Sequence, residues 1–238
     1  MNKKFSRAAV FALSLLGASA WMLRSGTTFA DQKKNGIFEQ DKGRFNILLD
    51  GKSVGREQFE ISEAEGGWVA TGTTELKPAV GPSTKINGKL TLQPSGAPVA
   101  YEWTSEADKK NGAHIVFANG VAKITLEMQG ARPFEQDLSF GAPMIAVLDN
   151  NLYHQYAVLA RLYDWSKRGP QTLPVLIPQD LTPGSITVES VGSATAAGKT
   201  YEGLRVTTTD AEVQLLLDAN HRLQRIEVPA AKVSIVRE

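Results

Sequence analysis

The chain contains no cysteine, so it forms no disulfide bond and holds no thiolate zinc or iron–sulfur site. It also lacks the lipid-modified cysteine of a bacterial lipoprotein. Histidine is scarce: His114, His154 and His221 are the three in the sequence, and none stands in H-E-x-x-H or another metal-ligand spacing. These absences predict a protein without a metal or other cofactor, whose stability depends on an apolar core.

Residues 1–30 have the pattern of a secretory signal peptide. Three basic residues open the chain, an apolar stretch follows from Ala8 to Leu23, and the small residues Ala20 and Ala30 offer two cleavage sites. The alternative is an uncleaved membrane anchor, but 16 residues are short for a bilayer span. We therefore expect a periplasmic or secreted protein without a stable membrane anchor, cleaved at Ala30 in preference to Ala20.

The mature chain, residues 31–238 after cleavage at Ala30, has a small net charge, and its charged residues are scattered along the sequence. Residues 1–30 hold four basic residues and no acidic one, so the mature chain would carry 22 basic and 25 acidic residues and a net charge of −3. Nucleic-acid binding requires a concentrated basic surface, which this composition does not offer. No nucleic-acid partner is expected.

From residue 44 onward, apolar and polar residues alternate, which is the pattern of β-strands with one buried face. Short spacing between the runs predicts antiparallel pairing in a single β-rich domain over 44–238, preceded by a flexible segment over 31–43. The apolar members of the clearest runs are Phe45, Ile47 and Leu49; Phe59 and Ile61; Leu90 and Leu92; Val99, Tyr101 and Trp103; Ile115 and Phe117; Ile124 and Leu126; Ile186 and Val188; Leu204 and Val206; Val213, Leu215 and Leu217; Val233 and Ile235.

Two hairpin turns stand out. Asn119-Gly120 lies between two alternating runs and suits a type I′ turn. Residues 51–55, Gly-Lys-Ser-Val-Gly, match the G-x-S-x-G pattern of serine hydrolases, but a strand pattern follows Ser53 where a nucleophile elbow needs a helix. The segment therefore predicts a hairpin tip with an ordinary surface serine.

One segment has helical spacing. Leu152, Tyr156, Leu159 and Tyr163 recur at i, i+4, i+7 and i+11 within Asn150–Trp165. The apolar residues upstream extend the predicted helix to 144–165. Three polar residues offer N-cap oxygens, and Gly-Pro ends the helix shortly afterwards; they are Asp149, Asn150 and Asn151, followed by Gly169 and Pro170.

These patterns predict a mainly β fold: a strongly curved antiparallel sheet, half-barrel and meander-like, packed around one α-helix. The leading hypothesis is an envelope protein that binds a lipid or another apolar small molecule, with Leu152, Tyr156, Leu159 and Tyr163 lining the cavity. The alternative is a structural or adaptor protein whose helix fills the core. A hydrolase using His154 is a third reading, but the sequence names neither a nucleophile nor a carboxylate partner for it, so no catalytic residue is assigned.

Both ends of the mature chain carry a resemblance. "FNILLDGKSVGREQFEIS" is similar to the opening hairpin, and "GKTYEGLRVTTTDAEVQLLLDANHRLQRIEVPAAKVSIVRE" to the closing strands, of exported bacterial β-rich proteins of unknown function. That group looks related to the periplasmic lipoprotein carriers, with a bent antiparallel sheet partly closed by helix. The resemblance implies a fold and a compartment but no catalytic residue, and the lack of cysteine departs from its lipid-anchored members.

Overall fold

The structure is a computed structural model that describes residues 37–77, 80–209 and 211–238. The predicted signal peptide and the first part of the predicted flexible segment, residues 31–36, lie outside the described residues. No helix in the described part of the chain has the length and apolar composition needed to cross a bilayer.

Fifteen strands form one large sheet in the described residues, in the order β8-β7-β6-β5-β4-β3-β2-β1-β15-β14-β13-β12-β11-β10-β9. The elements are β1 (Asp41–Leu49), β2 (Lys52–Ala64), β3 (Gly67–Leu76), β4 (Thr84–Leu92), β5 (Pro98–Glu106), β6 (Lys110–Ala118), β7 (Val121–Met128), β8 (Phe134–Ser139), β9 (Ala146–Val147), α1 (His154–Leu162), β10 (Gln171–Ile177), η1 (Pro178–Asp180), β11 (Thr182–Ala196), β12 (Lys199–Thr207), β13 (Glu212–Leu217), β14 (Leu223–Val228), η2 (Pro229–Ala231) and β15 (Val233–Arg237). Every strand pair is antiparallel except β9–β10. The predicted class, a curved antiparallel sheet around one α-helix, is confirmed.

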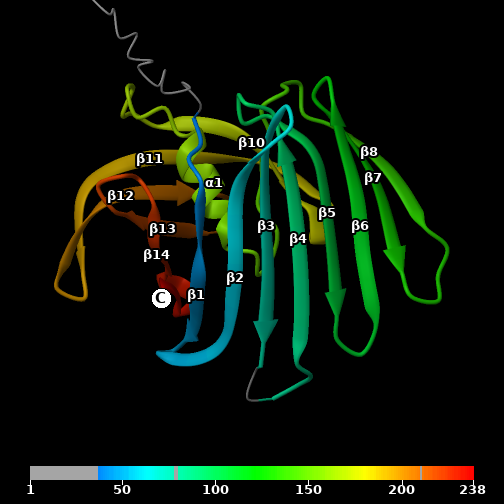
Figure 1. The fold of residues 1–238 in the computed structure, drawn as a ribbon, viewed down its shortest axis with the longest axis horizontal. Helices are drawn as coiled ribbons and strands as arrows, with labels where there is room; N and C mark the ends of the chain where they lie inside the picture. Colours follow the sequence, from blue (N-terminus) through cyan, green and yellow to red (C-terminus); the bar gives the residue numbers. More distant parts are fainter. Residues whose placement is uncertain (1–36, 78–79, 210) are drawn as a thin grey trace, which may run out of the picture. The chain divides into compact units, whose positions relative to one another are not determined.

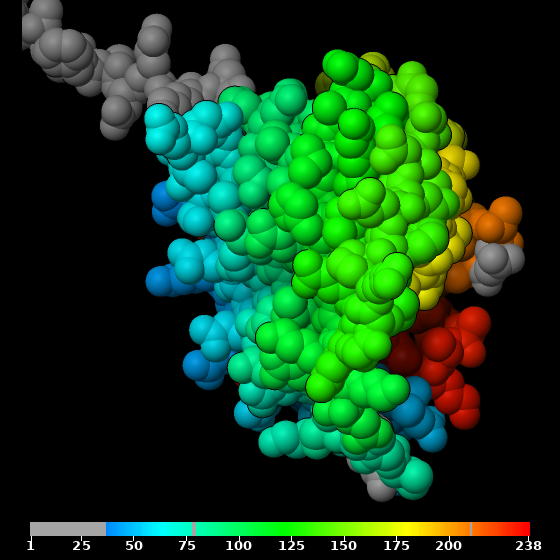
Figure 2. Space-filling model, turned by 90° about the vertical axis from the view of Figure 1, so that its right-hand side faces the viewer, coloured from blue at the N-terminus to red at the C-terminus, as the bar shows by residue number. Residues whose placement is uncertain are grey.

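The sheet consists of two meanders that meet at one seam. Strands β1 to β8 are neighbours in chain order, and so are β10 to β15. The seam is the pairing of β1 with β15, in which Ile47 lies opposite Ile235. Beside it, Arg237 forms a bidentate ion pair with the buried carboxylate of Asp41. Figure 1 shows α1 between the two meanders, and in Figure 2 the blue β1–β2 hairpin tip lies beside the red C-terminal residues.

The predicted hairpin turns are confirmed. Asp50 and Gly51 both have positive φ, as do Asn119 and Gly120, so each pair makes the two-residue turn that matches the twist of antiparallel strands. Ser53 lies in β2, and its hydroxyl donates a hydrogen bond to the side-chain oxygen of Asn46. The G-x-S-x-G pattern is therefore part of a hairpin, as predicted.

The start of the sheet lies earlier than expected. β1 begins at Asp41, whereas the sequence predicted a flexible segment up to residue 43. Phe38 is also buried, and its ring contacts Trp68. The polar composition of this stretch concealed the ion pair between Asp41 and Arg237, which gives the buried carboxylate a partner from the far end of the chain.

The helix is shorter than the predicted 144–165. Residues Ala146 and Val147 form β9, which pairs in parallel with β10, and Asn151 has a φ of +63°, a left-handed conformation that interrupts a helix. At the other end, the extended backbone of Tyr163 terminates α1. The predicted N-cap was also wrong, because Tyr153 occupies that position and makes no capping bond with its own side chain.

Glycines in the sheet make room for the helix. Gly72 of β3 pairs directly with Gly88 of β4 on the face toward α1. A Cβ atom on Gly72 would lie 2.3 Å from Nδ1 of His154, and one on Gly88 would lie 2.6 Å from Cδ1 of Leu152. His154 at the start of α1 and Leu152, two residues before the helix, thus pack against the backbone of these glycines, and this part of the interior is filled.

Gly72→Ala should lower the free energy of unfolding by more than about 2 kcal/mol, because the new methyl group overlaps a buried imidazole. Chemical denaturation measures the loss. Gly184→Ala in β11 is the matched control: its Cβ would meet only Val175 Cγ1 at 3.6 Å, and we expect a change within about 0.5 kcal/mol. Equal effects of the two substitutions would contradict this view of helix docking.

Candidate functional site

A buried carboxylate from the sheet caps the helix. Glu57 of β2 and His154 at the start of α1 are both fully buried, and Oε1 of Glu57 lies 2.5 Å from Nδ1 of His154. The same carboxylate accepts hydrogen bonds from the backbone N–H groups of Tyr153 (2.9 Å) and His154 (3.1 Å). Glu57 therefore does what an N-cap side chain does, but from 97 residues away in the sequence.

This pair bears on the hydrolase hypothesis. The contact with Glu57 engages Nδ1 of His154 and leaves Nε2 as the ring nitrogen that faces away from the carboxylate. That orientation resembles a catalytic acid–histidine pair, and it supplies the carboxylate partner that the sequence did not reveal. However, Nε2 is itself buried without a hydrogen-bond partner. A base must reach the proton that it removes, and His154 has no solvent-exposed side-chain surface.

A second buried carboxylate holds the turn before the helix. Asp149 accepts hydrogen bonds from the hydroxyl of Tyr101 (2.7 Å) and from the backbone N–H groups of Asn150 (3.0 Å) and Gln179 (2.9 Å). Its own backbone N–H donates to the side chain of Gln155. Burial raises the pKa of Asp149 to about 6, although the hydrogen bonds oppose the shift. Burial, and then the adjacent Asp149, raise the pKa of Tyr101.

Residues 149–153 are consequently held on several sides. The carboxylate of Glu57 accepts a hydrogen bond from the N–H of Tyr153, and the hydroxyl of Thr74 donates one to the carbonyl of Asn151 at 2.6 Å. These contacts come from β2 and β3, so the turn is fastened to the N-terminal meander. Asn151 and Tyr153 are thereby fixed as part of the wall of a neighbouring groove.

The groove lies at the β1–β2 hairpin, and we call it the hairpin groove. Its volume is about 600 Å³, and its surface is mostly apolar. The apolar lining comes from four separate parts of the chain, namely Ile47, Leu48, Leu49 and Val54 of the hairpin, then Leu76, Tyr153 and Val233. Two lysines, Lys52 and Lys77, lie at its rim and are exposed.

A β-bulge shapes this groove. The pairing of β1 with β2 shifts between Ile47 and Leu48, which leaves Val54 as the extra residue of β2. The carbonyl of Val54 instead accepts a hydrogen bond from the backbone N–H of Lys77 at 2.7 Å. Because the bulge breaks the regular alternation, both Val54 and Ile47 contribute to the apolar surface.

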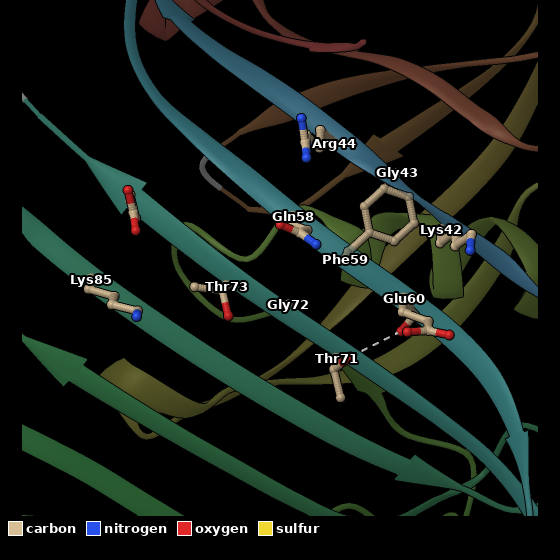
Figure 3. Close-up of a pocket in the computed structure, with 11 residues that line it drawn as sticks. Lys42, Gly43, Arg44, Gln58, Phe59, Glu60, Thr71, Gly72, Thr73 and Lys85 are labelled. Atoms are coloured by element: carbon tan, nitrogen blue, oxygen red, sulfur yellow. Dashed lines mark hydrogen bonds between the residues drawn. The ribbon is translucent and has the colours of Figure 1, made fainter.

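A second pocket, of about 580 Å³, lies over β1 to β4 (Figure 3). The residues that line it alternate along the strands with buried residues, and they carry both signs of charge. The positive ones are Lys42, Arg44 and Lys85, and the negative ones are Glu60 and Glu75. Mixed charges in an exposed, polar depression favour neither an apolar ligand nor a ligand of one sign. The hairpin groove is the better candidate site.

The four residues predicted to line a ligand cavity lie in or against the core. Leu152 and Leu159 are buried, and Tyr156 is half-buried. The hydroxyl of Tyr163 donates to the carbonyl of Gly169 and accepts from the N–H of Ser190. None of the four lines the hairpin groove, and their contact with a ligand stays a prediction.

The two remaining histidines have ordinary partners. His114 is exposed on β6, near Glu102. His221 lies in the turn between β13 and β14 and is half-buried. Its ring stacks on that of Trp165 with 3.8 Å between the ring centroids, and Nε2 lies 2.9 Å from Oε2 of Glu202. Across residues 37–77, 80–209 and 211–238, no three histidine, aspartate or glutamate side chains gather as a metal site would require.

Sequence reasoning missed the carboxylates and the groove. A signal for Glu57 was present, because it shares the alternation of Phe59 and Ile61 and so must point to the buried face. The apolar position of Val54 depended on a bulge, which no alternation pattern reveals.

The fold and the groove define a class: a β-rich, barrel-like protein with one large unclosed sheet. The chain is similar to a crystal structure of a beta-barrel-like protein of the domain of unknown function DUF1849 from Brucella abortus, with a TM-score of 0.55 and 8% identity over 84% of this chain and 94% of that one. It is also similar to a DUF1089 family protein from Pseudomonas aeruginosa, with a TM-score of 0.49 and 10% identity over 76% of this chain and 91% of that one. No family model and no curated protein matches the chain.

At these identities the likeness concerns the fold alone. It confirms the predicted resemblance to β-rich proteins of unknown function. The link to lipoprotein carriers stays a prediction.

Glu57→Gln should lower the free energy of unfolding by about 3 kcal/mol, because the amide group cannot accept all three hydrogen bonds and leaves a buried donor unpaired. Denaturant titration monitored by near-ultraviolet circular dichroism measures this. The exposed Glu60 on the same strand gives the control, and Glu60→Gln should change the value by less than about 0.5 kcal/mol. If the Glu57→Gln protein were as stable as the Glu60→Gln protein, Glu57 would not stabilise the start of α1 as we describe.

The raised pKa of Asp149 predicts a pH-dependent stability. Between pH 3.8 and about 6 the folded state binds more protons at Asp149 than the unfolded state, so this residue's contribution to the free energy of unfolding falls as pH rises. The fall amounts to about 3 kcal/mol across that window. Unfolding of the wild type and of Asp149→Asn at a series of pH values measures it, since the difference between the two proteins isolates Asp149. A difference that does not vary with pH would refute the assignment.

Proposed function

We propose that this protein binds one hydrocarbon chain of an amphiphilic molecule in the hairpin groove. The observation that carries the proposal is the apolar lining of a groove of about 600 Å³ in which Ile47, Leu76 and Val233 converge from separate strands. Sites for small apolar ligands are commonly of roughly 300–1,000 Å³, with a few polar groups at the mouth. Burial of the chain against these side chains would supply the binding energy.

The walls of the groove are supported in a way that suits binding. The side chain of Tyr153 is held beside a backbone N–H bonded to Glu57, and Asn151 is bonded to Thr74. A site held in place before the ligand arrives loses little conformational entropy on binding. In this proposal the four helix-side residues support the wall of the groove from the core and do not touch the hydrocarbon chain. They are Leu152, Tyr156, Leu159 and Tyr163.

Export is part of the same proposal. The signal-peptide pattern of residues 1–30 supports a periplasmic or secreted location, where lipids and acylated molecules have to pass through water. A relationship to lipoprotein carriers would fit such a role. It is supported by the sequence resemblance of the two ends of the chain.

An adaptor role is the second candidate. The helix fills the interior opposite Gly72 and Gly88, and the sheet is unclosed, with β8 at one edge and an exposed Phe134 on it. Unpaired strand edges can add a strand from another chain. This reading needs no apolar ligand.

Calorimetric titration with dodecanol separates the two candidates. The wild type should bind this neutral chain, and Val54→Asp should weaken binding at least about tenfold, because it places a charge inside the apolar lining. Val116→Asp makes the same change at an exposed valine on β6, outside the groove, and should bind like the wild type. Unchanged circular dichroism spectra would show that both variants fold. No binding by the wild type would reject the groove and leave the adaptor role.

A further inference from the structure

The rim of the hairpin groove carries positive charge. Lys52 is the first residue of β2, and Lys77 directly follows the last residue of β3. These strands are antiparallel neighbours, so both lysines lie at the same end of the groove. The hydrogen bond from the N–H of Lys77 to the carbonyl of Val54 fixes the backbone there.

The two lysines are not neutralised by acidic groups of the chain. Within the described residues, neither Lys52 nor Lys77 forms an ion pair, whereas the acidic residue on the same rim, Asp50, lies 3.8 Å from Lys232. Glu75 lines a neighbouring depression together with Lys77, but it lies opposite Arg56 in the strand pairing and, in the described part of the chain, forms no ion pair with Lys77. An apolar floor below two unpaired ammonium groups is complementary to a molecule with an apolar tail and a negative head.

We propose that the hairpin groove selects amphiphiles with one hydrocarbon chain and one anionic head group, and that Lys52 and Lys77 receive the head. This inference rests on the proposed function and adds the charge of the ligand to it. The chain is buried between Ile47, Leu76 and Val233, while the carboxylate or phosphate stays at the solvated rim. An exposed anion there keeps part of its hydration, so the selectivity is moderate and decreases with added salt.

Three probes of equal chain length test the head group: dodecanoate, dodecanol and dodecylammonium, each titrated calorimetrically at low salt below its aggregation threshold. For the wild type we expect dodecanoate to bind about tenfold more tightly than dodecanol, with dodecylammonium weakest, since each exposed lysine contributes about three- to fivefold. In Lys52→Gln/Lys77→Gln the affinity for dodecanoate should fall to that for dodecanol, while the affinity for dodecanol stays unchanged.

The matched control removes two exposed lysines elsewhere. Lys89→Gln/Lys123→Gln on β4 and β7 has the same net charge as the test variant and should keep the preference for dodecanoate. Equal affinities of the three probes for the wild type, or an equal loss of preference in both double variants, would overturn the charge selectivity and leave the groove itself intact. Absence of binding by all three probes would overturn the proposed function and this inference with it.

Discussion

A helix of nine residues is not stable by itself in water, so α1 depends on what the sheet offers to its first turn. Glu57 offers a carboxylate to two backbone N–H groups and to the ring of His154, and Gly72 offers the space in which that ring fits. The two contributions require each other: a side chain on Gly72 would push the ring away, and an apolar residue at 57 would leave three buried donors unsatisfied. From this contact the turn over 149–153, and with it one wall of the hairpin groove, takes its position.

The alternation of residues such as Phe45, Ile47 and Leu49 was sufficient to predict the sheet, because most strands bury one face and a period of two residues is the direct consequence. Asp50-Gly51 and Asn119-Gly120 likewise located their hairpins, since few residue pairs tolerate two positive φ angles. The ends of the helix could not be read in the same way. Leu152 fits the helical stripe, yet it is buried against Gly88 from a turn, because the sheet and not the helix supplies its neighbours.

The candidate site was the part that the sequence concealed. Its apolar surface combines Val54, which a bulge exposes, with Leu76 and Val233, which lie far apart in the chain. The helix residues that attracted notice, Leu159 and Tyr163, are instead buried in the core. The aromatic and aliphatic stripe of a helix indicates that something covers it, and here the sheet itself does so. The apolar groove instead lies where regular pairing is interrupted, at the end of the β1–β2 hairpin, because several apolar side chains gather there without a covering element.

The seam between β1 and β15 has a consequence for how the chain folds. Asp41 and Arg237 are 196 positions apart, so the join must wait for the closure of a very long loop, whereas the hairpins on either side form between near neighbours. Until that closure, β1 and β15 each present a row of unpaired backbone groups. During that interval these edges can pair with strands of other copies of the chain. Because the closure is slow, the topology that slows folding also prolongs the exposure to self-association.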